Sequence, residues 1–189
     1  MTTTLVLGGV RSGKSRHAEA LLAGPAPVTY IATGSPPDRA DPGGDLAGDR
    51  EWADRVARHR ARRPEHWTTL ETLDLPGVLG RERGRVLVDC LGEWLTRRAD
   101  EIGWAEPLLE DRLRDACDEL LGVWATTAAD VVLVSNEVGW GVVPASASGR
   151  LFRDVLGRLN AALAAGADRV HLVVAGRVLD LSVAPVVGE

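Results

Sequence analysis

Lysine is nearly absent from this chain. Among 22 basic residues other than histidine, only Lys14 is a lysine and all the others are arginines. Where arginine has replaced lysine almost everywhere, the remaining lysine is expected to do something that the larger guanidinium group cannot do. Acidic residues number 27, so the formal net charge is -5. This mildly acidic balance gives no general reason to expect nucleic acid or an anionic membrane as a partner.

Long apolar runs and paired cysteines are missing as well. No stretch of eighteen or more apolar residues occurs, so the sequence predicts no membrane span. The first residues, MTTTLVLGGVRSGKS, lack the basic start and the cleavage site of a signal peptide. Cys90 and Cys117 lie far apart and form no C-x-x-C pair, which argues against a disulfide scaffold or a zinc site. Together these absences predict a cytoplasmic protein.

The pattern of apolar residues predicts strands that alternate with helices. The chain has 189 residues, enough for a single domain with a sizeable core. We expect a mobile Pro- and Gly-rich loop at 35–48 and a loose tail after 181. The alternation predicts a three-layer α/β fold with a largely parallel sheet. Strands are predicted at 3–7, 28–32, 67–73, 86–90, 131–135, 170–175 and 177–181, and helices at 15–22, 49–62, 108–124 and 151–165.

A phosphate-binding motif follows the first predicted strand. Its glycines allow backbone N–H groups to approach phosphate oxygens, and the next helix directs its positive N-terminal end at them. The lysine reaches the terminal phosphates as a compact charge. Glycine is common in this chain, but the only lysine falls at the required position, so we interpret the chain as a P-loop NTPase-type, RecA-like domain. The motif G-x-x-x-x-G-K-[ST] is formed by Gly8, Gly9, Val10, Arg11, Ser12, Gly13, Lys14 and Ser15.

Two oxygen-bearing residues are candidate ligands for Mg²⁺. The hydroxyl of Ser15 stands at the motif position that usually binds the ion. P-loop sites also take a carboxylate from the end of a neighbouring strand, and Asp89 ends the apolar run VLVDC. An acid at a strand end is common in other proteins too, so the prediction for Asp89 depends on the P-loop.

Several classes of nucleotide-binding protein remain to be separated. A regulatory GTPase reads guanine with an N-K-x-D element, which this chain cannot supply because it has no second lysine. A small kinase or a nucleotidyl transferase fits the length best. The alternatives are a monofunctional small-molecule kinase and a nucleotide-gated regulatory protein, which would signal by a change of shape.

Motifs along nearly the whole chain resemble one known family. The segments GGVRSGKSRHAE, YIATGS, DRVARHRARRPEHW, VLVDCLGEWL and SNEVGWGVVP occur in this order. They are similar to those of the bifunctional adenosylcobinamide kinase / adenosylcobinamide-phosphate guanylyltransferases of cobalamin biosynthesis. The resemblance implies phosphorylation of adenosylcobinamide with ATP or GTP and Mg²⁺. It also implies transfer of GMP from GTP to the phosphate, which gives adenosylcobinamide-GDP and pyrophosphate. Members of the family assemble as homotrimers, so a homo-oligomer is expected.

The resemblance also implies a catalytic histidine. In the family the GMP is carried on a histidine, and the matching residue is His59 of HRARRP. A neutral imidazole is a good nucleophile at phosphorus, and the arginines around it favour the neutral form and can offset charge on the α-phosphate. Composition and spacing alone do not favour His59 over His17, His66 or His171.

The remaining candidate residues for nucleotide binding come from three segments. The resemblance and their position suggest Thr33, Gly34 and Ser35 after the second strand, Arg62 and Arg63 beside His59, and Glu71 in WTTLE. On a helix, Glu51 and Arg55 share a face with His59 and are expected to order its ring.

Overall fold

A computed structural model describes residues 1–35 and 46–187, and the side chains of 46–49, 51, 52 and 55 are also outside the description. The expected loop at 35–48 therefore lies largely outside the described residues. In the described part, the strands are β1 (Thr3–Gly8), β2 (Val28–Ala32), β3 (Trp67–Glu71), β4 (Arg85–Asp89), β5 (Asp130–Asn136), β6 (Arg169–Val174) and β7 (Arg177–Asp180). The helices are α1 (Lys14–Leu21), α2 (Leu46–Arg62), α3 (Leu75–Arg81), α4 (Leu91–Ile102), α5 (Leu109–Trp124) and α6 (Ala147–Ala165).

The strands form one sheet in the order β3-β2-β4-β5-β1-β6-β7. Every pair is parallel except β6 with β7, which is antiparallel. The strand β5 lies between β1, which leads into the phosphate loop, and β4, which ends at Asp89. Because the strands are parallel, these functional ends meet at the same edge of the sheet. The predicted α/β fold of the P-loop type, with its largely parallel sheet, is confirmed.

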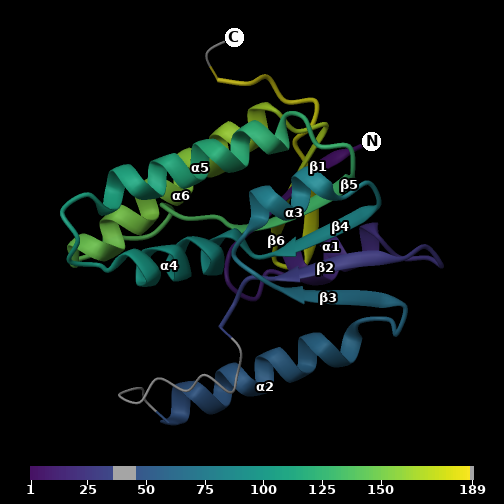
Figure 1. The fold of residues 1–189 in the computed structure, drawn as a ribbon, viewed down its shortest axis with the longest axis horizontal. Coiled ribbons are helices and arrows are strands. Elements are labelled where there is room, and N and C mark those ends of the chain that lie inside the picture. The colour runs from purple at the N-terminus through teal and green to yellow at the C-terminus, as the bar shows by residue number, and fades with distance from the viewer. Residues whose placement is uncertain (36–45, 188–189) are drawn as a thin grey trace.

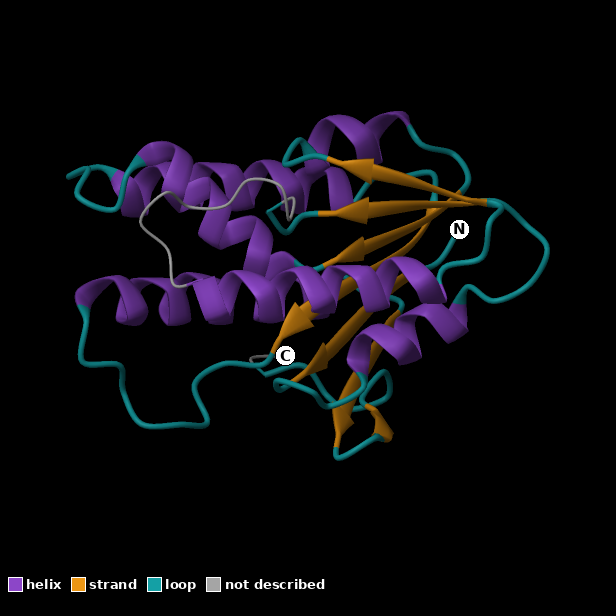
Figure 2. Ribbon diagram, turned by 90° about the horizontal axis from the view of Figure 1, so that it is seen from below, coloured by secondary structure: helices purple, strands orange, loops and turns teal. Residues whose placement is uncertain are grey.

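Helices cover both faces of the sheet, which gives three layers (Figure 1). Alternate residues of each central strand point to opposite faces. Leu5 and Leu133 belong to the apolar cluster under α3 to α6, whereas Val6 and Val132 belong to the cluster under α1. The helix α2 lies on the side of the sheet opposite to α5 and α6 (Figures 1 and 2). Continuous apolar runs are typical of strands buried on both faces, so the sequence located the central strands well.

Two helices were missed by the sequence prediction. The helix α3 contains a proline and two glycines, which are poor helix formers; Asp74 caps it by accepting a hydrogen bond from the backbone N–H of Gly77. The helix α4 follows directly after Cys90 and buries Trp94 and Leu95 in the larger cluster. Other boundaries differ by a few residues. For example, α6 starts before the predicted 151, because Ser146 caps its N-terminus.

The C-terminal segment is tied to the sheet at one point. The backbone N–H of Val170 donates to the hydroxyl of Ser182, which in turn donates to Asp180. Beyond that, Val183 and Val187 are exposed. No helix in the described part of the chain is both long and apolar enough to cross a membrane.

A pair of histidines joins α1 to β6. The Nε2 of His17 lies 2.9 Å from the Nδ1 of His171, whose side chain is buried. One ring donates and the other accepts, so the contact requires at least one neutral ring. Burial, and then the nearby His171, lower the pKa of His17 below its ordinary value.

This pair predicts a loss of stability in mild acid. Because the pKa of His17 is lower in the folded than in the unfolded chain, the unfolded chain binds the proton more readily. The free energy of unfolding is therefore expected to fall as the pH drops from about 6.5 through the folded-state pKa of His17. Urea denaturation across this pH range measures the effect. His17→Gln should flatten the pH dependence, whereas His66→Gln, at an exposed position, should not. Equal slopes in wild type and His17→Gln would contradict the assignment.

Candidate nucleotide-binding site

The loop between β1 and α1 is shaped by two glycines. A side chain at Gly8 would meet the hydroxyl of Ser12 and the carbonyl oxygen of Val173, both at 2.6 Å from the added carbon. Gly13 has a φ of 101°, a left-handed conformation that glycine adopts without strain. The carbonyl of Ser12 accepts a hydrogen bond from the N–H of Gly176 at 3.0 Å, which fixes the loop to the turn between β6 and β7.

The single lysine lies inside this loop. The side chain of Lys14 is only 5% exposed, and its Nζ donates to the carbonyl oxygen of Gly9 at 3.3 Å. Lys14 is the first residue of α1, so the ammonium group and the free N–H groups of the helix start lie close together. Both attract anions, which is the arrangement expected of a phosphate-binding loop.

A pocket of about 470 Å³ lies between the loop and α2. Among the described residues that line it, half carry a cationic side chain and none is acidic. This charge suits a polyphosphate. The pocket brings together the loop, His59 and Arg62, which the sequence had placed in one site, and it adds Arg16 and Arg58. The lining residues are Val10, Arg11, Ser12, Gly13, Lys14, Ser15, Arg16, Arg58, His59 and Arg62.

Polar side chains hold α2 against the rest of the molecule. Arg62 donates two hydrogen bonds to the carboxylate of Glu19 on α1, at 3.2 and 3.3 Å. Arg60 pairs with Glu71 on β3. Among the residues of α2 whose side chains are described, none belongs to either apolar cluster. Among the described residues, the contacts that hold His59 over the pocket are therefore ion pairs and hydrogen bonds.

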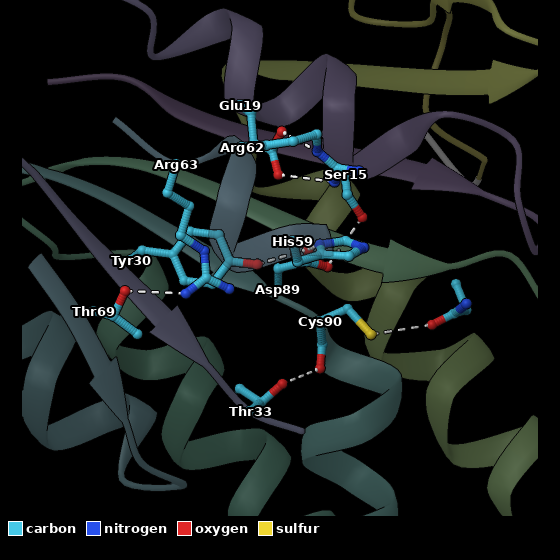
Figure 3. A network of polar contacts seen from close by, with 11 residues as sticks. Ser15, Glu19, Tyr30, Thr33, His59, Arg62, Arg63, Thr69, Asp89 and Cys90 are labelled. Atoms are coloured by element: carbon cyan, nitrogen blue, oxygen red, sulfur yellow. Dashed lines mark hydrogen bonds and ion pairs between the residues drawn. The ribbon is translucent and has the colours of Figure 1, made fainter. Parts of the chain in front are cut away.

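The carboxylate of Asp89 lies at the centre of a polar network, which Figure 3 shows. Its Oδ1 accepts a hydrogen bond from the hydroxyl of Ser15 at 3.3 Å, and its Oδ2 accepts one from the hydroxyl of Tyr30 at 2.9 Å. The Nδ1 of His59 lies 3.5 Å from Oδ2. Burial, and then the charge of Asp89, raise the pKa of Tyr30 above its ordinary range, so this hydroxyl keeps its proton. The carboxylate that contacts His59 is thus Asp89; the side chains of Glu51 and Arg55, expected to order the ring, lie outside the description.

A second pocket, of about 360 Å³, lies beside the end of α2. Arg63 and Glu71 line it, so these two candidates are outside the lining of the first pocket. The guanidinium carbon of Arg63 lies 3.5 Å above the ring of Tyr30, and its Nη1 donates to the hydroxyl of Thr69. Among the described residues, the buried Nε of Arg63 and Nε1 of Trp67 have no hydrogen-bond partner. Both residues line this pocket, although these two nitrogen atoms are themselves buried.

The three candidates after β2 have different surroundings. Thr33 is fully buried, and its hydroxyl donates to the carbonyl oxygen of Cys90 at 2.7 Å. The carbonyl of Gly34 accepts a hydrogen bond from Arg97 on α4. Ser35 is exposed. Thr33 therefore connects the ends of β2 and β4, Gly34 is hydrogen-bonded to α4, and none of the three lines either pocket.

Two residues of the network were missed by sequence reasoning. Tyr30 is the only tyrosine of the chain and stands in the strand segment VTYIA, where its role as a core residue was the simplest interpretation. Glu19 looks like an ordinary polar residue of the loop's helix. The sequence offered a signal only for Tyr30. It places a hydroxyl group two residues before the end of a strand, at the edge of the sheet where the functional residues were predicted.

Two sequence comparisons with known proteins agree on one family. Residues 4–181 match the family described as cobinamide kinase / cobinamide phosphate guanyltransferase. The bifunctional adenosylcobalamin biosynthesis protein CobU of Escherichia coli is 39% identical over 183 residues, which cover 91% of this chain and 95% of that protein. The bifunctional adenosylcobalamin biosynthesis protein CobP of Pseudomonas aeruginosa is 43% identical over 186 residues, which cover 96% and 98%. Among solved structures, the P4 protein of bacteriophage phi6 in complex with ADP has a TM-score of 0.40 at 17% identity, and the match covers 94% of this chain and 54% of that one.

Proposed function

Because this chain belongs to the cobinamide kinase / cobinamide phosphate guanyltransferase family, we infer that it is a bifunctional enzyme of cobalamin biosynthesis. It phosphorylates adenosylcobinamide with ATP or GTP. It then transfers GMP from GTP, through a guanylylated histidine, to give adenosylcobinamide-GDP and pyrophosphate. One observation carries the assignment of the site: a histidine and a phosphate-binding loop line the same pocket.

For the kinase step we propose that the loop from Gly8 to Ser15 holds the polyphosphate of the nucleotide. Its backbone N–H groups and the start of α1 would bind the phosphate oxygens. Lys14 would neutralise charge on the terminal phosphates as the γ-phosphoryl group moves to the alcohol. Its burial supports this role, because an ammonium group with few water contacts interacts strongly with a bound phosphate.

The residues present fit Mg²⁺. The hydroxyl of Ser15 and the Oδ1 of Asp89 lie 3.3 Å apart, and both are the hard oxygen ligands that this ion prefers. Mg²⁺ is usually held by one or two protein oxygens together with phosphates and water. We propose that Ser15 and Asp89 supply those oxygens, and that the ion offsets negative charge on the phosphates when it is bound.

For the transferase step we propose His59 as the nucleophile. Its ring lines the pocket, is 20% exposed and shares that pocket with Arg58 and Arg62. A nucleophile beside cationic groups can attack the α-phosphorus while the arginines balance the charge that develops there. The other described histidines have different surroundings, since His17 contacts His171 and His66 contacts the carbonyl of Gly24.

We propose that the second pocket contributes to recognition of the guanine base. Glu71 offers carboxylate oxygens, which suit the N–H donors of guanine, and the guanidinium group of Arg63, which lines the same pocket, is a donor that suits its acceptors. Arg60, which pairs with Glu71, and Arg62, which lines the first pocket, stand on the same turns of α2. This arrangement would place a base and its phosphates on two sides of one helix end.

We also propose a cytoplasmic location and a homotrimeric assembly, as the family resemblance implies. The two cysteines are buried free thiols, which suits a reducing compartment. The edge formed by β6 and β7 carries the exposed apolar side chains of Val174, Val178 and Leu179, which would suit a contact between copies. Light scattering on the purified protein measures the number of chains.

The function is tested by the products formed from adenosylcobinamide and Mg²⁺. With ATP alone, mass spectrometry should show adenosylcobinamide phosphate and no further product. After GTP is added, adenosylcobinamide-GDP and pyrophosphate should appear in equal amounts. His66→Gln, altered at an exposed histidine, serves as the matched control and should give both products.

Two outcomes would contradict the proposal. If the phosphate accumulates with GTP and no pyrophosphate forms, the chain is a monofunctional kinase. If neither product forms, the chain performs neither reaction and is better explained as a nucleotide-gated regulatory protein.

A further inference from the structure

The two oxygens of the Asp89 carboxylate have different surroundings. Oδ1 faces the phosphate loop through the hydroxyl of Ser15, whereas Oδ2 faces Tyr30 and His59 (Figure 3). The Asp89 side chain is only 9% exposed. A single buried carboxylate therefore contacts both the proposed ion site and the proposed nucleophile.

Tyr30 fixes the orientation of this carboxylate. Its ring is buried in the cluster under α1, next to Trp67, and the guanidinium group of Arg63 covers the ring. Packing of this kind leaves the phenol little freedom to turn. The hydroxyl donates to Oδ2 at 2.9 Å, so the carboxylate plane is held with Oδ2 toward α2.

A carboxylate at Nδ1 determines which tautomer a neutral imidazole adopts. The negative oxygen favours the tautomer with hydrogen on Nδ1, and the lone pair is then on Nε2. The separation of 3.5 Å between Nδ1 and Oδ2 is longer than a hydrogen bond. Catalytic hydrogen bonds are often long before substrate binds and shorten in the complex.

We propose that Asp89, held by Tyr30, is a positioning residue for guanylyl transfer that orients His59 through Nδ1. This inference rests on the proposed function of His59. It gives Asp89 a second role beside its proposed contact with the ion, with one carboxylate oxygen serving each role.

With this tautomer, the attack of His59 on GTP needs no proton transfer at the ring. The lone pair of Nε2 attacks the α-phosphorus of GTP, a nitrogen–phosphorus bond forms, and the bond to the bridging oxygen breaks as pyrophosphate leaves. The ring becomes a cation that keeps its hydrogen on Nδ1, where the carboxylate of Asp89 stabilises the charge. In the second half, an oxygen of adenosylcobinamide phosphate attacks the same phosphorus, and the electron pair returns to Nε2.

The tautomer of His59 can be measured without nucleotide or metal. We would record nitrogen–hydrogen correlation spectra of the histidine rings at about pH 8, where an unperturbed imidazole is neutral. Wild type should show hydrogen on Nδ1 of His59. Asp89→Asn should shift the population to hydrogen on Nε2, and Tyr30→Phe, which keeps the ring, should shift it in part. The signals of His66 serve as an internal control and should not change.

A kinetic readout separates this role from a purely structural one. In a single turnover with GTP, the rate of GMP attachment should fall by about 10²–10⁴-fold in Asp89→Asn, by analogy with an orienting carboxylate in other triads. In Tyr30→Phe it should fall by about tenfold, more than the rate of adenosylcobinamide phosphorylation falls. His66→Gln should match wild type in both rates.

The possible failures are distinguishable. If wild type acquires GMP but His59 carries its hydrogen on Nε2, or if Asp89→Asn leaves the tautomer unchanged, the positioning role is wrong and the proposed function stands. If Tyr30→Phe lowered the rate of GMP attachment and the rate of adenosylcobinamide phosphorylation equally, the positioning role would also be wrong. The hydroxyl of Tyr30 would then act through the phosphate loop and not through His59. If wild type acquires no GMP, the proposed role of His59 fails, whichever tautomer is seen.

Discussion

His59→Ala is expected to phosphorylate adenosylcobinamide and to stop at that product. Alanine removes the only imidazole ring among the described residues that line the pocket, so the proposed acceptor of GMP is lost. The Nζ of Lys14 keeps its contact with the carbonyl oxygen of Gly9, which involves no atom of His59. Guanylyl transfer should fall by at least about 10³-fold, the scale of removing a catalytic nucleophile. Phosphorylation should stay within a few-fold of wild type.

The measurement is the mass of the intact protein after incubation with GTP and Mg²⁺. Wild type and the control His66→Gln should gain one GMP group, and acid should release it, because a phosphorus–nitrogen bond to imidazole is labile in acid. His59→Ala should gain nothing. A full GMP adduct on His59→Ala would show that another side chain is the nucleophile. Loss of phosphorylation as well would show that the variant is damaged beyond the proposed role, so thermal unfolding is measured beside it.

Lys14→Ala is expected to lose both activities, since both nucleotides would place phosphates in the one pocket. Removal of a single preorganised contact to a transferring phosphoryl group lowers the rate by about 10²–10³-fold. Lys14→Arg should be nearly as impaired, although it keeps the charge. The side chain is buried and its Nζ lies against the carbonyl of Gly9, so we expect the broader planar guanidinium group to displace the loop.

Steady-state rates of phosphorylation and calorimetric titration of ATP test this prediction together. Arg83→Ala is a suitable control, because Arg83 is exposed and donates only to carbonyls of its own turn, at the opposite end of β4. It should behave as wild type. Near-normal rates in Lys14→Arg would mean that the position requires only a positive charge, and that its identity in an arginine-rich chain has no functional reason.

Local patterns predicted the phosphate loop and the central strands. The loop is specified by residues close in sequence, and the structure has Gly13 in a left-handed conformation and Lys14 at the helix start. Apolar runs such as VVLVS identify strands because both faces of a parallel strand are buried. These features depend on residues that are close together in the sequence, and for that reason they can be deduced from one sequence.

The contacts around Asp89 could not be deduced in that way. Its partners Ser15, Tyr30 and His59 come from α1, β2 and α2, and they meet because β4 lies next to β2 and is joined to β1 through β5 in the sheet. Strand order was not part of the prediction. The helix α4 was overlooked for a similar reason. Its apolar residues pack in the larger apolar cluster, and the sequence around them gives no strong local signal for a helix.

The way α2 is attached has a consequence for how the nucleotide enters and leaves. Its described contacts with the body are polar: Arg62 with Glu19, Arg60 with Glu71 and His59 with Asp89. Partly exposed ion pairs contribute only about 0–1 kcal/mol each, and water replaces their partners readily. Among the residues of α2 whose side chains are described, none belongs to an apolar cluster, so lifting the end of this helix would uncover little apolar surface from them and the hydrophobic effect would hardly oppose it. The proposed nucleophile, His59, would thus be carried on a part of the molecule that can withdraw and return without disturbing the core, and the same freedom would let a bulky guanylylated side chain turn from one substrate to the next.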